Sequence, residues 1–147
     1  MKANEFLGIY VKMLSAYSDA VTKACRKYGV NRTCFDILIF LKNNPEDNTA
    51  RDIVEKRGIK KSMASVAVEQ LCMMDYVTRY QDQADRRIQH LKLTRKSESI
   101  TCMGLKLQAA FEKRVLNGMN AEERKTYLSA TEKLLAALKS MKAEEFI

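Results

Sequence analysis

The sequence contains few of the residues from which metal centres and enzyme sites are built. It has one histidine, His90, and its four cysteines (Cys25, Cys34, Cys72 and Cys102) form no C-x-x-C pair. A zinc site needs several such ligands at short spacing, so no metal site is expected. We also find no phosphate-binding loop and no catalytic constellation. The sequence therefore predicts a protein that is not an enzyme and needs no cofactor.

Long apolar runs are also absent. No run approaches the roughly 18 residues that a membrane span requires. The N-terminal stretch carries Lys2 and Glu5 and lacks both the apolar block and the cleavage site of a signal peptide. A cytoplasmic protein without membrane contact is expected, in which the cysteines are reduced thiols. The 147 residues, 46% hydrophobic and 30% charged, suit one soluble domain with a real core.

Apolar residues recur at three- and four-residue spacing over most of the chain, which predicts helices. The chain has a single proline, Pro45, which should end a helix, as should Gly29. We expect Thr33, Thr94 and Asn120 to cap the helices that follow them. The helices expected on this basis are Glu5–Tyr28, Cys34–Lys42, Arg95–Leu116 and Ala121–Met141. The two terminal helical regions are expected to come together and form a dimer.

The stretch from Thr49 to Thr94 has a different pattern. Two short helices, Ala50–Arg57 and Lys60–Met74, are expected on either side of Gly58, with Asn48 or Thr49 as the first cap. A helix–turn–helix of this kind is commonly used to place its second helix in the major groove of DNA.

A hairpin is expected directly after these helices. Its strands are Tyr76–Gln81 and Ile88–Leu93, and the polar turn Asp82–Arg87 joins them. Helix, turn, helix and hairpin in this order predict a winged helix–turn–helix, in a mainly α (α+β) fold with long N- and C-terminal helices. We expect a single domain over residues 1–147. Its parts would be dimerisation helices at 1–30 and 118–147, the winged lobe at 31–97 and a connecting helix at 98–117.

The charge of the chain is concentrated in this lobe. Residues 49–97 hold eleven Lys/Arg against six Asp/Glu, a surplus of five out of the total net charge of +8. A basic face on a segment with DNA-reading geometry is typical of a nucleic-acid binder. Taken alone, a solvated cationic surface explains the charge equally well.

Individual side chains in the lobe suit DNA contacts. Lys61, Ser62 and Ser65 fall on the first turns of the second helix, where they can bond base edges or phosphates. Arg86 and Arg87 at the hairpin tip suit the narrow minor groove, where the negative potential is enhanced. We expect Asp85 to orient a nearby cation, since an acid facing DNA would repel it.

These residues resemble the MarR (multiple antibiotic resistance regulator) family of transcriptional regulators over essentially the whole chain. The segment Asp85–Thr94 is similar to the family's wing signature, Gly58–Ser65 with Leu71 is similar to its recognition-helix segment, and Gly118–Glu123 matches the break before its final helix. The chain departs from the family pattern at three positions. Lys60 and Ser97 stand where Ser and Gly are usual, and Val66 stands where Arg is frequent.

The resemblance implies a homodimer that binds a pseudo-palindromic operator in double-stranded DNA, usually as a repressor. It also implies a small, often phenolic, effector that relieves binding. With the resemblance included, the DNA-binding residues expected are Thr49, Lys60, Lys61, Ser62, Ser65, Val66, Gln70, Arg86 and Arg87.

Two further sites are open at this stage. Tyr10, Tyr17, Phe35 and Phe40 could line an effector pocket, although such aromatics are more often core or interface. Cys25 or Cys34 could make the protein a thiol-based redox-sensing regulator, which requires an exposed thiol of lowered pKa. A winged-helix module that binds an acidic protein instead of DNA is the alternative from another functional class.

Overall fold

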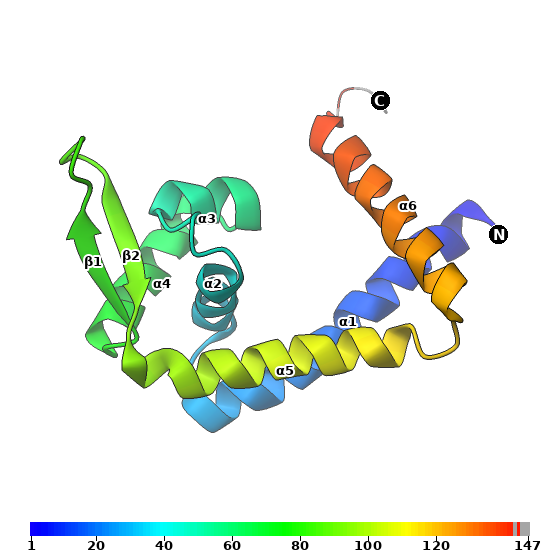
Figure 1. Cartoon of the computed structure of the whole chain (residues 1–147), viewed down its shortest axis with the longest axis horizontal. Coiled ribbons are helices and arrows are strands. Elements are labelled where there is room, and N and C mark those ends of the chain that lie inside the picture. Colours follow the sequence, from blue (N-terminus) through cyan, green and yellow to red (C-terminus); the bar gives the residue numbers. More distant parts are fainter. Residues whose placement is uncertain (143, 145–147) are drawn as a thin grey trace. The chain divides into compact units, whose positions relative to one another are not determined.

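The structure, a computed structural model, describes residues 1–142 and 144 and is mainly helical, with one two-stranded sheet (Figure 1). This confirms the mainly α fold class. The elements in chain order are α1 (Ala3–Tyr28), α2 (Arg32–Asn43), α3 (Ala50–Arg57), α4 (Lys61–Met73), β1 (Val77–Gln81), β2 (Gln89–Leu93), the 3-10 turn η1 (Arg95–Ser97), α5 (Glu98–Val115) and α6 (Ala121–Ser140). The chain divides into two compact units, residues 1–109 and 110–147.

Helix α2 is the centre of the first unit. It is apolar nearly all round, and a helix of this composition is stable only when it is enclosed. Phe35, Ile37 and Leu38 are completely buried, and α2 packs against α1, α3, α4 and β2. On α5, a Cβ added to Gly104 would lie 2.1 Å from Cδ1 of Ile39, so the glycine permits close packing against α2.

The helix–turn–helix is confirmed. Helix α3 has the expected bounds, and Gly58 ends it with φ +75°, a left-handed conformation that a residue with a Cβ adopts only at a cost. Helix α4 begins one residue later and ends one residue earlier than predicted. Its buried residues are Ala64, Ala67, Val68 and Leu71, which recur at three- and four-residue spacing and form the inner face against α2 and α3.

The hairpin is also confirmed. Strands β1 and β2 pair antiparallel, from Val77 opposite Leu93 to Gln81 opposite Gln89. Val77 and Leu91 are buried, whereas Thr78, Arg79 and Tyr80 are exposed. The hairpin is therefore attached to the lobe at one end and along one side, and its turn lies in solvent.

Two predicted helix caps are wrong. Asn31, not Thr33, caps α2, because its side-chain oxygen accepts a bond from the amide of Cys34. The hydroxyl of Thr94 donates to the carbonyl of Asp75 at 2.5 Å and caps nothing, and a 3-10 turn precedes α5. The second error arises because a hydroxyl near a helix start can bond to another acceptor that the tertiary structure brings close.

In the second unit, α6 begins as predicted. The amide of Glu123 donates to the side chain of Asn120, and the carboxylate of Glu123 accepts from the amide of Asn120, which completes a capping box. No residue of α6 is buried, and several of its large apolar side chains are exposed: Leu128, Leu134, Leu135 and Leu138. Within the described residues, no helix is both long and apolar enough to cross a membrane.

Candidate nucleic-acid interface

The outer face of α4 is the part of the lobe that is free to enter a groove. Because the inner face is fixed by its buried residues, the opposite face carries Ser62, Val66, Glu69 and Met73, all of which are exposed. Lys61 and Ser65 lie on one flank of this face, and Met63 and Gln70 lie on the other. Most of the expected recognition-helix residues are therefore accessible on one helix.

A shallow pocket lies along each flank of α4. One, of about 490 Å³, lies between α3, α4 and the hairpin, and Lys61, Ser65, Arg51, Arg79 and Gln89 contribute to its lining. The other, of about 360 Å³, lies between α4 and the start of α2, and it is lined by Asn31, Thr33, Ser62, Met63, Val66, Ala67 and Gln70. The expected recognition residues are thus divided between two grooves that run along the same helix.

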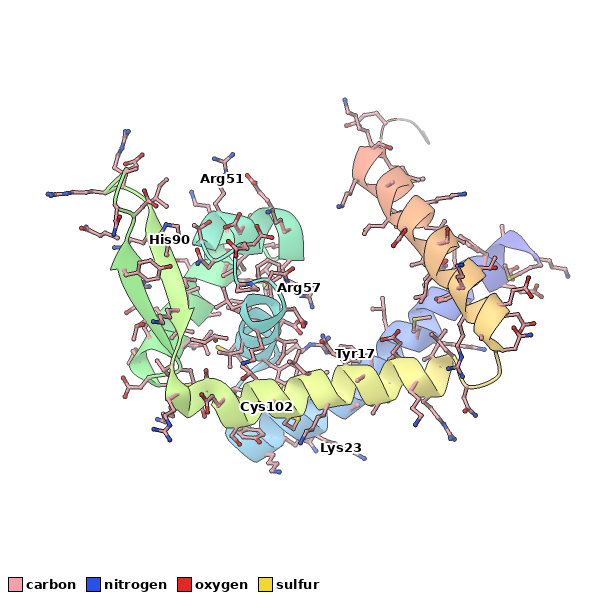
Figure 2. The ribbon with its side chains drawn as sticks, in the orientation of Figure 1. Tyr17, Lys23, Arg51, Arg57, His90 and Cys102 are labelled. Carbon is pink, nitrogen blue, oxygen red and sulfur yellow. The ribbon has the colours of Figure 1, made fainter. Side chains whose placement is uncertain are left out.

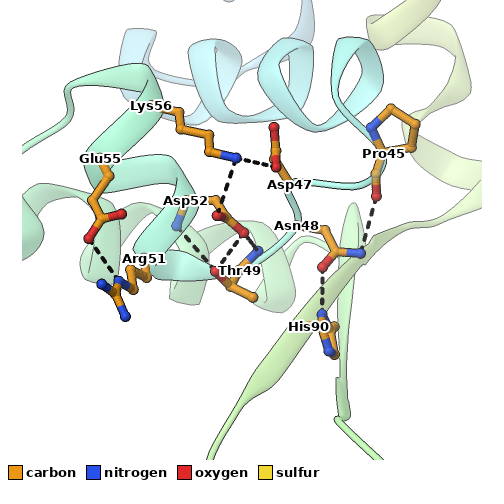
Figure 3. Close-up of polar contacts among 9 residues, drawn as sticks. All are labelled: Pro45, Asp47, Asn48, Thr49, Arg51, Asp52, Glu55, Lys56 and His90. Carbon is orange, nitrogen blue, oxygen red and sulfur yellow. Dashed lines mark hydrogen bonds and ion pairs between the residues drawn. The ribbon is translucent and has the colours of Figure 1, made fainter. Parts of the chain in front are cut away.

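The side chains of two expected DNA-binding residues, Gln70 and Thr49, already form hydrogen bonds within the lobe. The side-chain oxygen of Gln70 accepts bonds from Nδ2 of Asn31 at 2.9 Å and from Sγ of Cys34 at 3.4 Å. The hydroxyl of Thr49 is occupied in capping α3. It accepts from the amide of Asp52 at 3.1 Å and donates to the Asp52 carboxylate at 2.7 Å (Figure 3). Both residues therefore already have a structural role that accounts for their position.

The Asp52 carboxylate is held in its charged form. Burial is the largest single influence on its pKa and raises it. The hydrogen bonds from the hydroxyl and amide of Thr49 and the charge of Lys56 together outweigh burial, so the pKa lies below its ordinary value. Lys56 also forms an ion pair with Asp47, which connects the loop before α3 to the end of that helix (Figure 3).

The start of α4 has no such cap. Lys60 occupies the N-cap position and makes no side-chain capping bond there. The amides of the first turn of α4 therefore lack the side-chain partner that a serine at this position would offer. Free amides at a helix N-terminus attract anions, and Lys60 and Lys61 add positive charge at the same place.

The β1–β2 hairpin forms the wing of the fold, and the two arginines at its tip point into solvent. Both Arg86 and Arg87 are exposed, and the side chain of Arg87 is 92% accessible. The Asp85 carboxylate accepts bonds from the amide of Arg87 at 3.0 Å and from its Nε at 3.3 Å. Asp82 in turn accepts from the amides of Ala84 and Asp85, both at 2.9 Å. Two aspartates thus organise the turn around the arginines by accepting bonds from its backbone.

His90 on β2 is half-buried. It lies between the hairpin and the chain before α3 (Figure 2), where Nδ1 is 2.6 Å from Oδ1 of Asn48 and Nε2 is 2.8 Å from Oδ1 of Asp82. Its ring stacks on Tyr80, with the two centroids 5.1 Å apart. The hydrogen bond to His90 is the main reason that the pKa of Asp82 is lowered. No pattern in the sequence indicated this contact, because Asn48 and His90 are 42 positions apart.

The four aromatic residues considered for an effector pocket lie in different surroundings. Phe35 is completely buried and Phe40 is nearly so, and both lie on α2 within the hydrophobic core. Tyr10 is exposed on α1, and Tyr17, further along α1, is half-buried with the Arg32 guanidinium over its ring. None of the four belongs to the lining of the two pockets beside α4.

The two cysteines considered for redox sensing have the opposite of the required properties. Cys25 and Cys34 are both buried. Burial is the largest cause of the raised pKa of each thiol. A sensing cysteine is accessible and has a lowered pKa, because the thiolate is the reactive form. Among the described residues, no group of three or more His, Cys, Asp or Glu is placed to hold a metal ion.

The segment that contains most of the winged lobe is similar to a known family. Residues 28–88 match the model of the MarR family. A search of curated proteins gives no match.

Several solved structures share the fold of the chain. Transcriptional regulator PA3341 superposes with a TM-score of 0.80 at 19% identity, covering 92% of this chain and 99% of that one. A MarR protein from Peptoclostridium difficile gives 0.78 at 17% identity, with 95% and 90% covered. A Listeria monocytogenes protein described as a MarR family transcriptional regulator, solved with 26mer DNA, gives 0.79 at 14% identity, with 95% and 90% covered.

The fold and the sequence match agree on the class. The chain is a winged helix–turn–helix protein. The MarR family model matches the segment that contains α2, α3, α4 and the start of the hairpin, so the chain is similar to this family over that segment.

Proposed function

We propose that the protein is a dimeric transcriptional regulator that binds an inverted-repeat operator in double-stranded DNA. The observation that carries the proposal is that one basic lobe presents both an exposed recognition helix and an exposed arginine-tipped wing. In this arrangement α4 enters the major groove, and Arg86 and Arg87 reach the adjacent minor groove. The Listeria monocytogenes structure with 26mer DNA supports this use of the fold.

The dimer is part of the proposal. Large apolar side chains are exposed along α1 (Phe6, Leu7, Ile9, Tyr10, Val11 and Leu14) and along α6. Exposed apolar surface of this extent typically marks an interface. An isologous dimer would place two copies of α4 about one helical turn of DNA apart, with half-sites roughly 10 bp from centre to centre.

Relief by a small effector is a further part of the proposal. A ligand that favours a dimer with wrongly spaced recognition helices must weaken DNA binding by the same factor by which DNA weakens ligand binding. The four aromatic residues of α1 and α2 give no specific support for its site. Screening small phenolic compounds for a shift in melting temperature, followed by DNA affinity with and without each hit, tests this part separately.

The salt dependence of DNA binding tests the electrostatic basis of the proposal. If about eight phosphates are neutralised per dimer, the logarithm of the affinity should fall with the logarithm of salt concentration at a slope near −7. Fluorescence anisotropy with a labelled duplex measures this slope. A slope near zero on specific DNA would contradict the proposed interface.

A winged-helix module for an acidic protein partner is the second candidate. The exposed side chain of Met63 on α4 favours it, because methionine is enriched at protein–protein interfaces. Retention of duplex DNA at low salt distinguishes the two candidates, since the second predicts none.

A further inference from the structure

The outer face of α4 carries an apolar side chain among polar ones. Val66 lies in the middle of this face and is 60% exposed. One turn before it lies Ser62, and one turn after it lies Gln70, whose side-chain oxygen is bonded to Asn31 and Cys34. Glu69 beside it is paired with Arg79 at 2.9 Å. Val66 is therefore the side chain at the centre of this face that can neither donate nor accept a hydrogen bond.

A single exposed valine is ordinary on a protein surface and needs no explanation by itself. Val66 is informative because it lies in the middle of the outer face of α4. A helix laid in the major groove presses the middle of its outer face against the edges of the bases. A valine there cannot bond the donors and acceptors of those edges. The major groove offers one apolar group that distinguishes a base pair, which is the 5-methyl group of thymine.

We propose that Val66 is a specificity-determining residue that packs against the 5-methyl group of a thymine in each half-site. This inference rests on the proposed function, since it assumes that α4 enters the major groove. Val66 excludes water from the methyl group and leaves a polar base edge at that position without a partner. The operator accordingly contains a thymine at a fixed place in each half-site, and other bases are disfavoured there.

The other strongly exposed apolar residue of this face provides a control. Met73 is 78% exposed, but it is the last residue of α4, whereas Val66 is the sixth. At 1.5 Å of rise per residue, Met73 lies about 10 Å further along the helix axis. The N-terminal part of a recognition helix contacts base edges, so Met73 is placed beyond the contact and Val66 within it.

The test compares thymine with deoxyuridine, which differs only by lacking the 5-methyl group. A duplex recovered from a random pool by the wild-type protein is resynthesised with each thymine replaced in turn, and affinities are measured at one salt concentration. Loss of one buried methyl group should weaken binding about fourfold per half-site at the contacted thymine. In Val66→Ala, the same replacement should change the affinity less than about 1.5-fold.

Both Val66→Ala and the control Met73→Ala alter exposed positions, so both should keep the wild-type melting temperature. Met73→Ala should retain the full sensitivity to deoxyuridine at the contacted thymine. The inference is overturned if no thymine is sensitive, or if the sensitivity persists in Val66→Ala. Recovery of no duplex at low salt would contradict the proposed function itself, and this failure appears before any thymine is replaced.

Discussion

Arg79 on β1 donates a hydrogen bond to Glu69 on α4, with 2.9 Å between Nη2 and Oε2. This ion pair connects the wing to the recognition helix. The bond to Glu69 is also the main cause of the raised pKa of Arg79. Glu69 lies on the outer face of α4, where an unpaired carboxylate would repel phosphates. The arginine therefore both positions the wing and compensates an acid on the surface proposed to meet DNA.

Removing Arg79 should weaken DNA binding more when Glu69 is present than when it is absent. We expect Arg79→Ala to reduce the affinity about tenfold, and the same change in a Glu69→Ala background to reduce it only about twofold. Stability should change by less than about 1 kcal/mol, because the pair is exposed to solvent. A double-mutant cycle of DNA affinity gives the coupling, and additive effects would contradict this account.

Arg87 provides a second prediction. Its side chain is almost fully exposed at the wing tip, so Arg87→Ala should weaken operator binding at least tenfold and leave the dimer and melting temperature unchanged. Lys23 on α1 is a matched control, since Lys23→Ala removes one positive charge from an exposed site outside the winged lobe (Figure 2). If the two variants bind equally well, the wing has no part in the mechanism.

The third prediction concerns His90. His90→Ala removes the partner of Asn48 and Asp82 and the stacking contact with Tyr80, so it should destabilise the protein by about 1–2 kcal/mol. The exposed neighbour Lys92 is the control, and Lys92→Ala should change stability by less than about 0.5 kcal/mol. Urea unfolding measures both. Equal stabilities of the two variants would show that His90 does not hold the hairpin in place.

The capping box of α3 predicts a dependence of stability on pH. Asp52 has a lowered pKa in the folded protein, so its contribution is fully present above its ordinary pKa near 4 and is lost as the pH falls through the lower, folded-state value. The stability difference between the wild type and Asp52→Asn should therefore shrink between about pH 5 and pH 2. Urea unfolding across this range measures it. A difference that grows as the pH falls would reverse the assigned sign.

The sequence was sufficient to predict the fold of the winged lobe, because the patterns that indicate its helices and hairpin involve residues close together in the chain. Gly58 needs a left-handed conformation at the turn, and the apolar spacing of α4 defines its inner face, so both follow from residues close in the chain. The polar turn between two β-prone runs predicted the hairpin in the same way. The uncapped start of α4 also follows from residue type, because Lys60 has no side-chain oxygen to accept a bond from the helix amides.

Several contacts that sequence reasoning missed join distant segments. His90 meets Asn48, and Gln70 meets Asn31, through pairings that only the packed lobe creates. The hydroxyl of Thr94 likewise donates to the carbonyl of Asp75 in another segment, and it therefore does not cap a helix. Residue type also did not reveal that Phe35 is enclosed completely by the core, and the aromatic effector pocket stays a prediction. The dimer and the division into dimerisation, DNA-binding and connecting parts stay predictions.

The most direct test of the account is selection of bound duplexes from a random DNA pool, with the mass of the protein in solution determined alongside. The account predicts a particle of twice the 16.8 kDa chain and an enriched inverted repeat with half-sites about 10 bp apart. A dimer that enriches no sequence, even at low salt, would contradict DNA recognition. That result would leave the fold intact and favour the protein-binding alternative.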